Sequence, residues 1–292
     1  MHTLLTPKSL AQAIGVSESS LRRWVDSGAV PLTRTAGGHR RIAWADAMRF
    51  IRQSKQAVVR PEILGLRQPP SAEGDTPQDD GQRLFRALHT GHLEQARGIV
   101  FSLYLTGTPL TALFDGPIRF ALGRIGELWH DDRRGILIEH RATDITLQIL
   151  NQLRQTIPAA GADSPLAIGG SPEGDTYLIP SLMAAIVAAD RGFREMNMGP
   201  QTPVELLAKA AAESKTRVVC LSLSVRPSDA VLREIGALSG ALAGQGIPLV
   251  IGGRHAQLAS STARPGLHLV KSMAEFAAFL AGLAATKPES TQ

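Results

Sequence analysis

Cysteine, aromatic residues and long apolar runs are all scarce in this chain of 292 residues. The only cysteine is Cys220, which excludes a disulfide within the chain and leaves thiolate metal sensing without ligands. Aromatic residues make up 4% of the chain and hydrophobic residues 43%, so its cores must be mostly aliphatic. No run of about 18 apolar residues occurs and the start has no secretion signal, which predicts a cytoplasmic protein with no membrane partner.

Positive charge, by contrast, is concentrated at one end of the sequence. The first 66 residues contain ten lysines and arginines and four acidic residues, a net charge of +6. The whole chain has a formal net charge of only +5, so the remaining residues are close to neutral. Because lysine and arginine neutralise phosphates, a cationic module on a near-neutral body indicates a polyanionic partner such as double-stranded DNA.

Turn and helix signals within residues 1–66 predict a winged helix-turn-helix. Thr6-Pro7 is typical of a helix start, residues 14–16 form a break, and Ser17 can cap a second helix that runs to about Asp26. Residues 32–35 and 39–42 flank Ala-Gly-Gly and predict a hairpin, the wing. In such a motif the second helix reads the major groove and the wing follows the backbone, although an ordinary solvated basic surface is the alternative. The predicted DNA contacts are Ser17, Ser19, Arg22, Arg23, Arg34, His39, Arg40 and Arg41.

Two further segments precede the last domain. Residues 67–82 read RQPPSAEGDTPQDDGQ, which is polar, rich in Pro and Gly and without apolar periodicity. This composition predicts a flexible linker that lets the head move relative to the body. Between 83 and 157, apolar residues recur at steps of three and four, interrupted by short breaks, which predicts a four-helix bundle.

Residues 163–287 alternate between short apolar segments and helical stretches. The predicted strands are 165–169, 194–198, 218–222, 248–251 and 267–270, and the helices between and after them are 179–189, 203–214, 229–243 and 271–285. This alternation predicts a flavodoxin-like, doubly wound parallel sheet. The fold class is thus multidomain α and α/β, and a ligand site would lie at the carboxyl ends of the strands.

The head resembles that of MerR-type regulators. Leu21–Gly28, with the sequence LRRWVDSG, and Thr35–Arg41, with the sequence TAGGHRR, carry the resemblance. It implies that the paired arginines of the second helix and of the wing contact DNA. Metal-sensing members of that family have a long dimerisation helix and a cysteine-bearing loop after the head, and this chain departs from that pattern.

The order of head, bundle and α/β domain resembles the CarH/LitR group, light-responsive repressors that sense adenosylcobalamin. Trp129, Glu139 and His140 match the group's Trp-x9-Glu-His signature. The resemblance implies that Trp129 stacks over the upper face of the corrin, that His130 captures cobalt after photolysis, and that Glu139 and His140 line the pocket. It also implies cofactor contacts from the strand ends: Asp175, Tyr177, Ser222, Gly252 and Gly253.

The loop that should ligate cobalt departs from the group. Its pattern is Asp/Glu-x-His-x-x-Gly, in which the histidine ligates cobalt and the acid orients it. Here Asp175 is followed by Tyr177 at the histidine position and Pro180 at the glycine position. A phenol with an ordinary pKa of about 10 is a poor donor to cobalt, although a phenolate can bind ferric haem. The sequence therefore predicts that His-ligated adenosylcobalamin binding is lost.

Three functions remain open. The favoured one is a repressor whose cobalamin-binding-like module is a sensor and oligomerisation domain, controlled by a photoreceptor or antirepressor protein such as a blue-light receptor. It predicts no enzyme activity and a dimer or tetramer on promoter DNA. The second is a repressor that binds adenosylcobalamin or another tetrapyrrole in an altered mode. The third, remote one is a corrinoid-dependent methyltransferase-like enzyme.

Structural roles are also open for single residues. In the alternative to the cofactor roles, Trp129 is an ordinary core residue of an amphipathic helix, and Glu139 and His140 are an ordinary pair on the helix surface. Asp175 without a histidine can cap the next helix, and glycines end many parallel strands.

Overall fold

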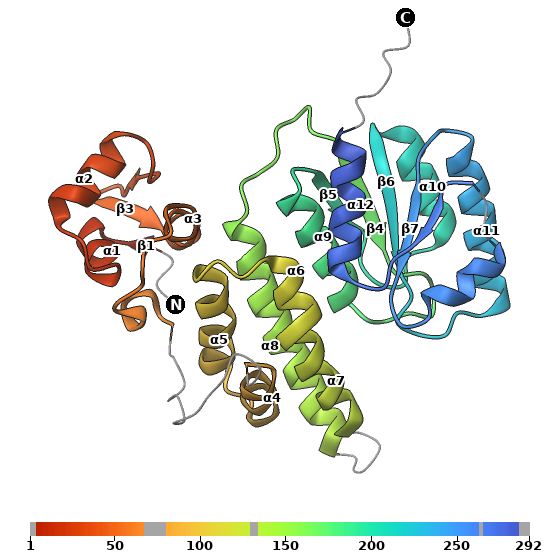
Figure 1. The fold of residues 1–292 in the computed structure, drawn as a ribbon, viewed down its shortest axis with the longest axis horizontal. Coiled ribbons are helices and arrows are strands. Elements are labelled where there is room, and N and C mark those ends of the chain that lie inside the picture. Colours follow the sequence, from red (N-terminus) through yellow and green to blue (C-terminus); the bar gives the residue numbers. More distant parts are fainter. Residues whose placement is uncertain (1–3, 67–79, 129–133, 263–264, 286–292) are drawn as a thin grey trace, which may run out of the picture. The chain divides into compact units, whose positions relative to one another are not determined.

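The computed structural model describes residues 4–66, 80–128, 134–262 and 265–285 (Figure 1). The chain splits into two compact units, Met1–Thr156 and Ile157–Gln292, each described by itself below. The predicted linker residues 67–79 and the predicted cofactor residues Trp129 and His130 lie outside the described residues.

The head, residues 4–66, begins with two short helices, α1 (Pro7–Ala13) and α2 (Glu18–Asp26). Both predicted caps are confirmed: the Thr6 hydroxyl accepts a hydrogen bond from the Ser9 amide at 3.0 Å, and Ser17 accepts one from the Ser20 amide at 3.1 Å. An antiparallel sheet follows in the order β1 (Leu4–Leu5), β3 (Arg40–Ala43), β2 (Thr33–Arg34), so β1 adds a strand that the sequence did not indicate.

A third helix, α3 (Trp44–Ser54), starts directly after β3 and closes the core of the head. Its residues Met48 and Ile51 are fully buried, together with Leu21 of α2. The ring of Trp24 on α2 packs against that of Phe50 on α3, with centroids 5.1 Å apart. These contacts fix α2 against α3, and a short 3-10 turn, η1 (Pro61–Leu64), ends the head.

A helical bundle occupies residues 80–156. It consists of α4 (Asp80–Thr90), α5 (Leu93–Leu105), α6 (Leu110–Leu113), a π-helical turn η3 (Phe114–Ile118), α7 (Arg119–Glu127) and α8 (Arg134–Thr156). Helix α4 begins at Asp80, inside the stretch predicted as linker, because Asp80 pairs with Arg83 at 3.1 Å and Gly81 packs closely on the Phe120 ring. The π turn lies where Pro117 removes a backbone donor, an interruption that helical periodicity does not reveal.

The second unit is a five-stranded parallel sheet with helices on both faces. Its strands are β4 (Leu166–Gly170), β5 (Arg194–Asn197), β6 (Thr216–Ser222), β7 (Leu249–Gly252) and β8 (Leu267–Leu269), in the spatial order β5-β4-β6-β7-β8. The helices are α9 (Ile179–Asp190), α10 (Val204–Glu213), α11 (Asp229–Ala243) and α12 (Met273–Ala285), with a 3-10 segment η5 (Ala256–Thr262) after β7. This is the flavodoxin-like order, which confirms the predicted doubly wound parallel sheet.

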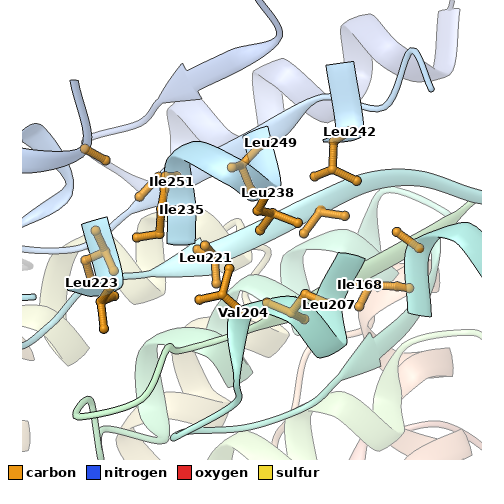
Figure 2. Packing of buried hydrophobic residues seen from close by; sticks show 14 of the residues in the cluster. Ile168, Val204, Leu207, Leu221, Leu223, Ile235, Leu238, Leu242, Leu249 and Ile251 are labelled. Carbon is orange, nitrogen blue, oxygen red and sulfur yellow. The ribbon is translucent and has the colours of Figure 1, made fainter. Parts of the chain in front are cut away.

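The largest aliphatic core lies between this sheet and helices α10 and α11. Figure 2 shows Leu207 of α10 and Ile235 of α11 packed on strand residues such as Leu221. Helices α9 and α12 pack against each other on the other face (Figure 1). Within the described residues, no helix is both long and apolar enough to cross a membrane.

Two adjacent leucines of α10 provide a matched test of this core. Leu207 is 0% exposed and Leu206 is 45% exposed. We expect Leu207→Ala to lower the free energy of unfolding by about 2–5 kcal/mol, because it removes buried methyl groups and leaves a cavity. Leu206→Ala should change it by about 0.5 kcal/mol or less, since its side chain lies in solvent. Urea unfolding of both variants measures the difference, and equal losses would contradict this assignment of the core.

Candidate functional site

Most of the residues singled out by the sequence lie in two regions, the basic face of the head and the carboxyl ends of the parallel strands, whereas Glu139 and His140 lie on α8. On the head, Ser17, Ser19, Arg22 and Arg23 are exposed. Leu21 is buried, so α2 faces the core with its apolar side and solvent with its polar side. The Ser17 hydroxyl also lies 2.8 Å from that of Ser19, and it serves the helix as a cap.

The hairpin carries the second group of predicted DNA contacts. Arg34 of β2 lies directly opposite Arg40 of β3, and both are exposed, as is His39. Like charges in opposed positions destabilise a hairpin, so this pair does not serve the stability of the free protein. Arg41 is half-buried and donates to the Arg40 carbonyl at 3.0 Å.

The helix and the hairpin meet at one place on the head. Arg22 and Arg40 both line a small cleft of about 120 Å³, whose other lining residues are Pro7, Glu18, Val25 and Leu32. Within the described residues, none of the five arginines at 22, 23, 34, 40 and 41 forms an ion pair. The head therefore presents guanidinium groups from two elements, and two of them, those of Arg22 and Arg40, share a cleft with Glu18.

In the second unit, the loops after β4, β5, β6 and β7 form what we call the sheet rim: residues 171–178, 198–203, 223–228 and 253–255. Asp175 lies at its centre and is 2% exposed. Its Oδ2 accepts hydrogen bonds from the amides of Ser224 at 2.6 Å and Val225 at 3.1 Å, and its Oδ1 accepts one from the Tyr177 amide at 3.1 Å. Both oxygens thus bind backbone amides and connect the β4 loop to the β6 loop.

The remaining loops of the rim are joined by backbone hydrogen bonds. The amide of Ser171 donates to Gly199 at 2.9 Å and that of Thr202 donates to Ser171 at 2.8 Å, which joins the β4 and β5 loops. The amide of His255 donates to Leu223 at 2.9 Å and joins the β7 loop to the β6 loop. Gly253 has a φ of +101°, and a Cβ there would lie 2.5 Å from the Leu223 carbonyl oxygen. Its glycine is therefore required by packing within the protein itself.

The rim gathers the predicted cofactor residues of the second unit. Ser222 pairs with Gly252 across β6 and β7, and Gly253 and Asp175 contact the same β6 loop. Tyr177 is 47% exposed and its ring is available to solvent. In the first unit, Glu139 is half-buried and His140 exposed on α8. The predicted site residues do not include His255 or Gln201. The side-chain oxygen of Gln201 accepts a hydrogen bond from the Gly174 amide at 3.2 Å.

The residues of the rim do not fit a His-ligated corrinoid. The β4 loop offers cobalt a phenol in place of an imidazole, and the carboxylate that would orient a ligand has both oxygens occupied by amides. Ser171 has a fully buried hydroxyl with no hydrogen-bond partner in the described part of the chain, and a ligand could reach it only if the rim opened. Among the described residues, no group of three or more His, Cys, Asp or Glu residues could hold a metal ion. Burial raises the pKa of the Cys220 thiol to about 12, so it stays a neutral thiol at physiological pH.

Comparison with solved structures shows the fold of the body. The monomethylamine corrinoid protein of Methanosarcina barkeri superposes with a TM-score of 0.55 at 16% identity, over 71% of this chain and 100% of that chain. This coverage exceeds the length of the second unit, so the likeness extends into the helices of the first. The matched part of the chain therefore shares the fold of that corrinoid protein, a helical bundle followed by a parallel α/β domain.

Two other structures are more distant. A cobalamin-binding protein from Desulfitobacterium hafniense covers 70% of this chain and 98% of that chain at 15% identity, with a TM-score of 0.38. The methanol:cobalamin methyltransferase complex of Methanosarcina barkeri covers 80% and 93% at 14% identity, with a TM-score of 0.37. Neither score is high enough to argue from. No protein-family model matches the chain, and no curated protein matches it.

The hydrogen bonds of Asp175 provide a test of its role. We expect Asp175→Ala to lower the free energy of unfolding by about 2–4 kcal/mol, because three partly buried amides lose the buried carboxylate that accepts their hydrogen bonds. The neighbouring Glu173→Ala, which removes an exposed carboxylate from the same loop, should change it by about 0.5 kcal/mol or less. Urea unfolding, with hydrogen exchange of the amides of Ser224 and Val225, measures both effects. Unchanged stability and exchange in Asp175→Ala would show that the carboxylate does not hold the rim together.

Proposed function

We propose that this protein is a sequence-specific DNA-binding transcriptional regulator, with a winged helix-turn-helix head and a sensor module of cobalamin-binding fold. One observation carries the proposal: α2 and the hairpin expose arginines that form no ion pair with the acidic residues the structure describes, and Arg22 and Arg40 line the same cleft. A helix N-terminal region bearing Ser19, Arg22 and Arg23 has the side chains that reach base edges and phosphates in a major groove. The arginines of the hairpin would then neutralise backbone phosphates beside it.

The proposal includes self-association on DNA. A single small head contacts few phosphates, and specific binding at physiological salt usually requires two heads on repeated half-sites. We therefore place the protein on promoter DNA as a dimer or tetramer, where it would repress by blocking access. The resemblance to light-responsive repressors supports this direction of regulation.

The proposed sensor acts without His-ligated adenosylcobalamin. The support is the chemistry of the rim, where Tyr177 replaces the ligand and Asp175 is committed to amides. The rim also exposes Tyr177 and Leu178, by 47% and 43%, a surface suited to a protein partner. Control by a partner such as a blue-light receptor would then replace control by a cofactor. The competing hypothesis is a repressor that binds adenosylcobalamin or another tetrapyrrole in an altered binding mode. We propose no enzyme activity for the protein.

The head provides the first test. In Arg22→Ala/Arg23→Ala, promoter affinity should fall by about 100-fold or more, and the slope of log affinity against log salt should flatten by about 2, because two phosphate or base contacts are lost. Arg60→Ala is the matched control, since Arg60 is exposed in the same head but pairs with Glu62 at 3.1 Å. Mobility shifts at several salt concentrations measure both quantities. Equal affinities for the wild type and the double variant would contradict the assignment of α2.

The rim provides the second test. Adenosylcobalamin added to the purified protein in darkness should not co-elute with it from a gel-filtration column, because Tyr177 stands where the resembling group has its cobalt-ligating histidine. The control is Tyr177→His/Pro180→Gly, which restores the ligand pattern of the resembling group. Stoichiometric cobalamin absorbance in the wild-type protein peak would refute the cofactor-independent proposal and favour the altered binding mode.

A further inference from the structure

Two of the ten basic residues of the head, Arg49 and Arg52, lie on α3 and contact the bundle of the same unit. Arg49 donates from Nε to the Thr156 carbonyl at 3.0 Å and from Nη2 to the Gln155 carbonyl at 3.2 Å. Its third nitrogen, Nη1, binds Asp46 Oδ1 at 2.8 Å, which holds the guanidinium in place. These acceptors are the last carbonyls of α8, so Arg49 caps the carboxyl end of that helix.

Arg52 does the same at the end of α5. It donates from Nη1 to the Tyr104 carbonyl and, at 3.1 Å, to the Thr108 carbonyl. Its guanidinium also lies 4.1 Å from the centroid of the Tyr104 ring, a cation–π arrangement. The Tyr104 hydroxyl lies 2.8 Å from the Thr156 hydroxyl, which links the two helix ends that the arginines cap.

The bundle reciprocates these contacts. Arg97 of α5, 4% exposed, donates to the Gly65 carbonyl at the end of the head. The ring of Trp44 packs edge-on against Phe101 of α5 with centroids 4.9 Å apart, and its Nε1 donates to the Leu64 carbonyl at 2.9 Å. We call these contacts between head and bundle the joint. The joint has an aromatic pair at its centre and, around it, arginines that donate to backbone carbonyls.

Helix α3 connects the joint to α2, the helix proposed to enter the major groove of DNA. On one side it binds the ends of α5 and α8 through Arg49 and Arg52, and elsewhere along its length Phe50 packs on Trp24 of α2. The chain passes from the first unit to the second directly after Thr156, the residue whose carbonyl Arg49 binds. The helix is only 11 residues long, so a shift at either arginine moves the support of α2 as well.

The joint is not fully packed. A cleft of about 700 Å³ lies beside it. It is lined on the head by Arg52, residues 55–58, Pro61 and Leu66, and on the bundle by Gly98, Ser102 and residues 105–107. Because this space is not filled by side chains, small movements of the head relative to the bundle on that side would not cause steric clashes.

We infer that Arg49 and Arg52 are positioning residues of the DNA-reading surface, and that α3 transmits the state of the bundle to α2. This inference rests on the proposed function. The two arginines hold α2 in one orientation relative to the bundle and do not neutralise phosphates. A partner or ligand that displaces the carboxyl ends of α5 or α8 would then weaken DNA binding without touching the head.

The first experiment needs no DNA. Hydrogen exchange of the full chain is compared for the wild type, Arg49→Gln/Arg52→Gln, Arg49→Lys/Arg52→Lys and the control Arg60→Gln. Both double variants should exchange faster, by about 5-fold or more, in α3 and in the last turns of α5 and α8, because lysine cannot reproduce the forked geometry of arginine. Helix α9 and the Arg60→Gln protein should remain unchanged. Wild-type protection of those turns in both double variants would overturn the joint.

The second experiment measures DNA affinity against salt for the same proteins. If the arginines position α2, the Gln and Lys pairs should both weaken binding by about 5-fold or more with an unaltered salt slope. If the arginines contact phosphates instead, the Gln pair should flatten the salt slope by about 2. The Lys pair, which keeps both charges, should then bind DNA like the wild type. That result overturns the inference. A wild-type protein that binds no promoter DNA would refute the proposed function, and the exchange experiment would still decide whether the joint exists.

Discussion

Repulsion among the exposed arginines of the head is the constraint on which the functional interpretation depends. Arg34 and Arg40 lie directly opposite each other, and neither has an acidic partner among the described residues. Each such like-charge pair costs a few tenths of a kcal/mol up to about 1 kcal/mol in the free protein, and only an added anion removes the cost. The head tolerates it because Leu21, Ile42 and Met48 form a closed core beneath the charged surface. A surface that is unfavourable alone and favourable beside phosphates is what a DNA-binding module requires.

Local rules were enough to predict most elements of this chain. The caps at Thr6 and Ser17 and the five parallel strands follow from side-chain chemistry and apolar patterning within a few residues. The sequence did not predict β1, which has two residues and exists only because it pairs with β3, or the π turn at Pro117. It also counted Arg49 and Arg52 as part of the cationic surface, because their carbonyl partners lie 52 to 107 residues away. Charge can be read from a sequence, but the partner of a charge in general cannot.

The candidate site shows the same division. The sequence singled out Asp175 as a cofactor contact and predicted that the cobalt-ligating histidine is lost. It left open whether the Asp175 carboxylate instead caps a helix. The structure assigns it to amides 2, 49 and 50 residues further along the chain, which come together only when β4 pairs with β6. Gly253 likewise matched a cofactor pattern, whereas its neighbour in space is the Leu223 carbonyl. Residues that match a binding motif can therefore serve the architecture of the loops themselves.

That architecture bears on how such a module could regulate. A cofactor site whose loops need the cofactor for their order can act as a switch through binding alone. Here the loops of the rim are held by internal hydrogen bonds: the Asp175 carboxylate and the Ser171 and Leu223 carbonyls accept from amides of neighbouring loops, so this order needs no ligand. A rigid rim is better suited to present a constant surface, with Tyr177 and Leu178 exposed on it, than to change shape around a small molecule. Regulation would then have to act on a less tightly packed element, and the joint beside its open cleft in the first unit is such an element. Around its aromatic centre, its contacts are arginine side chains on helix-end carbonyls, and a change of a few ångströms can break these hydrogen bonds without unfolding either the head or the bundle.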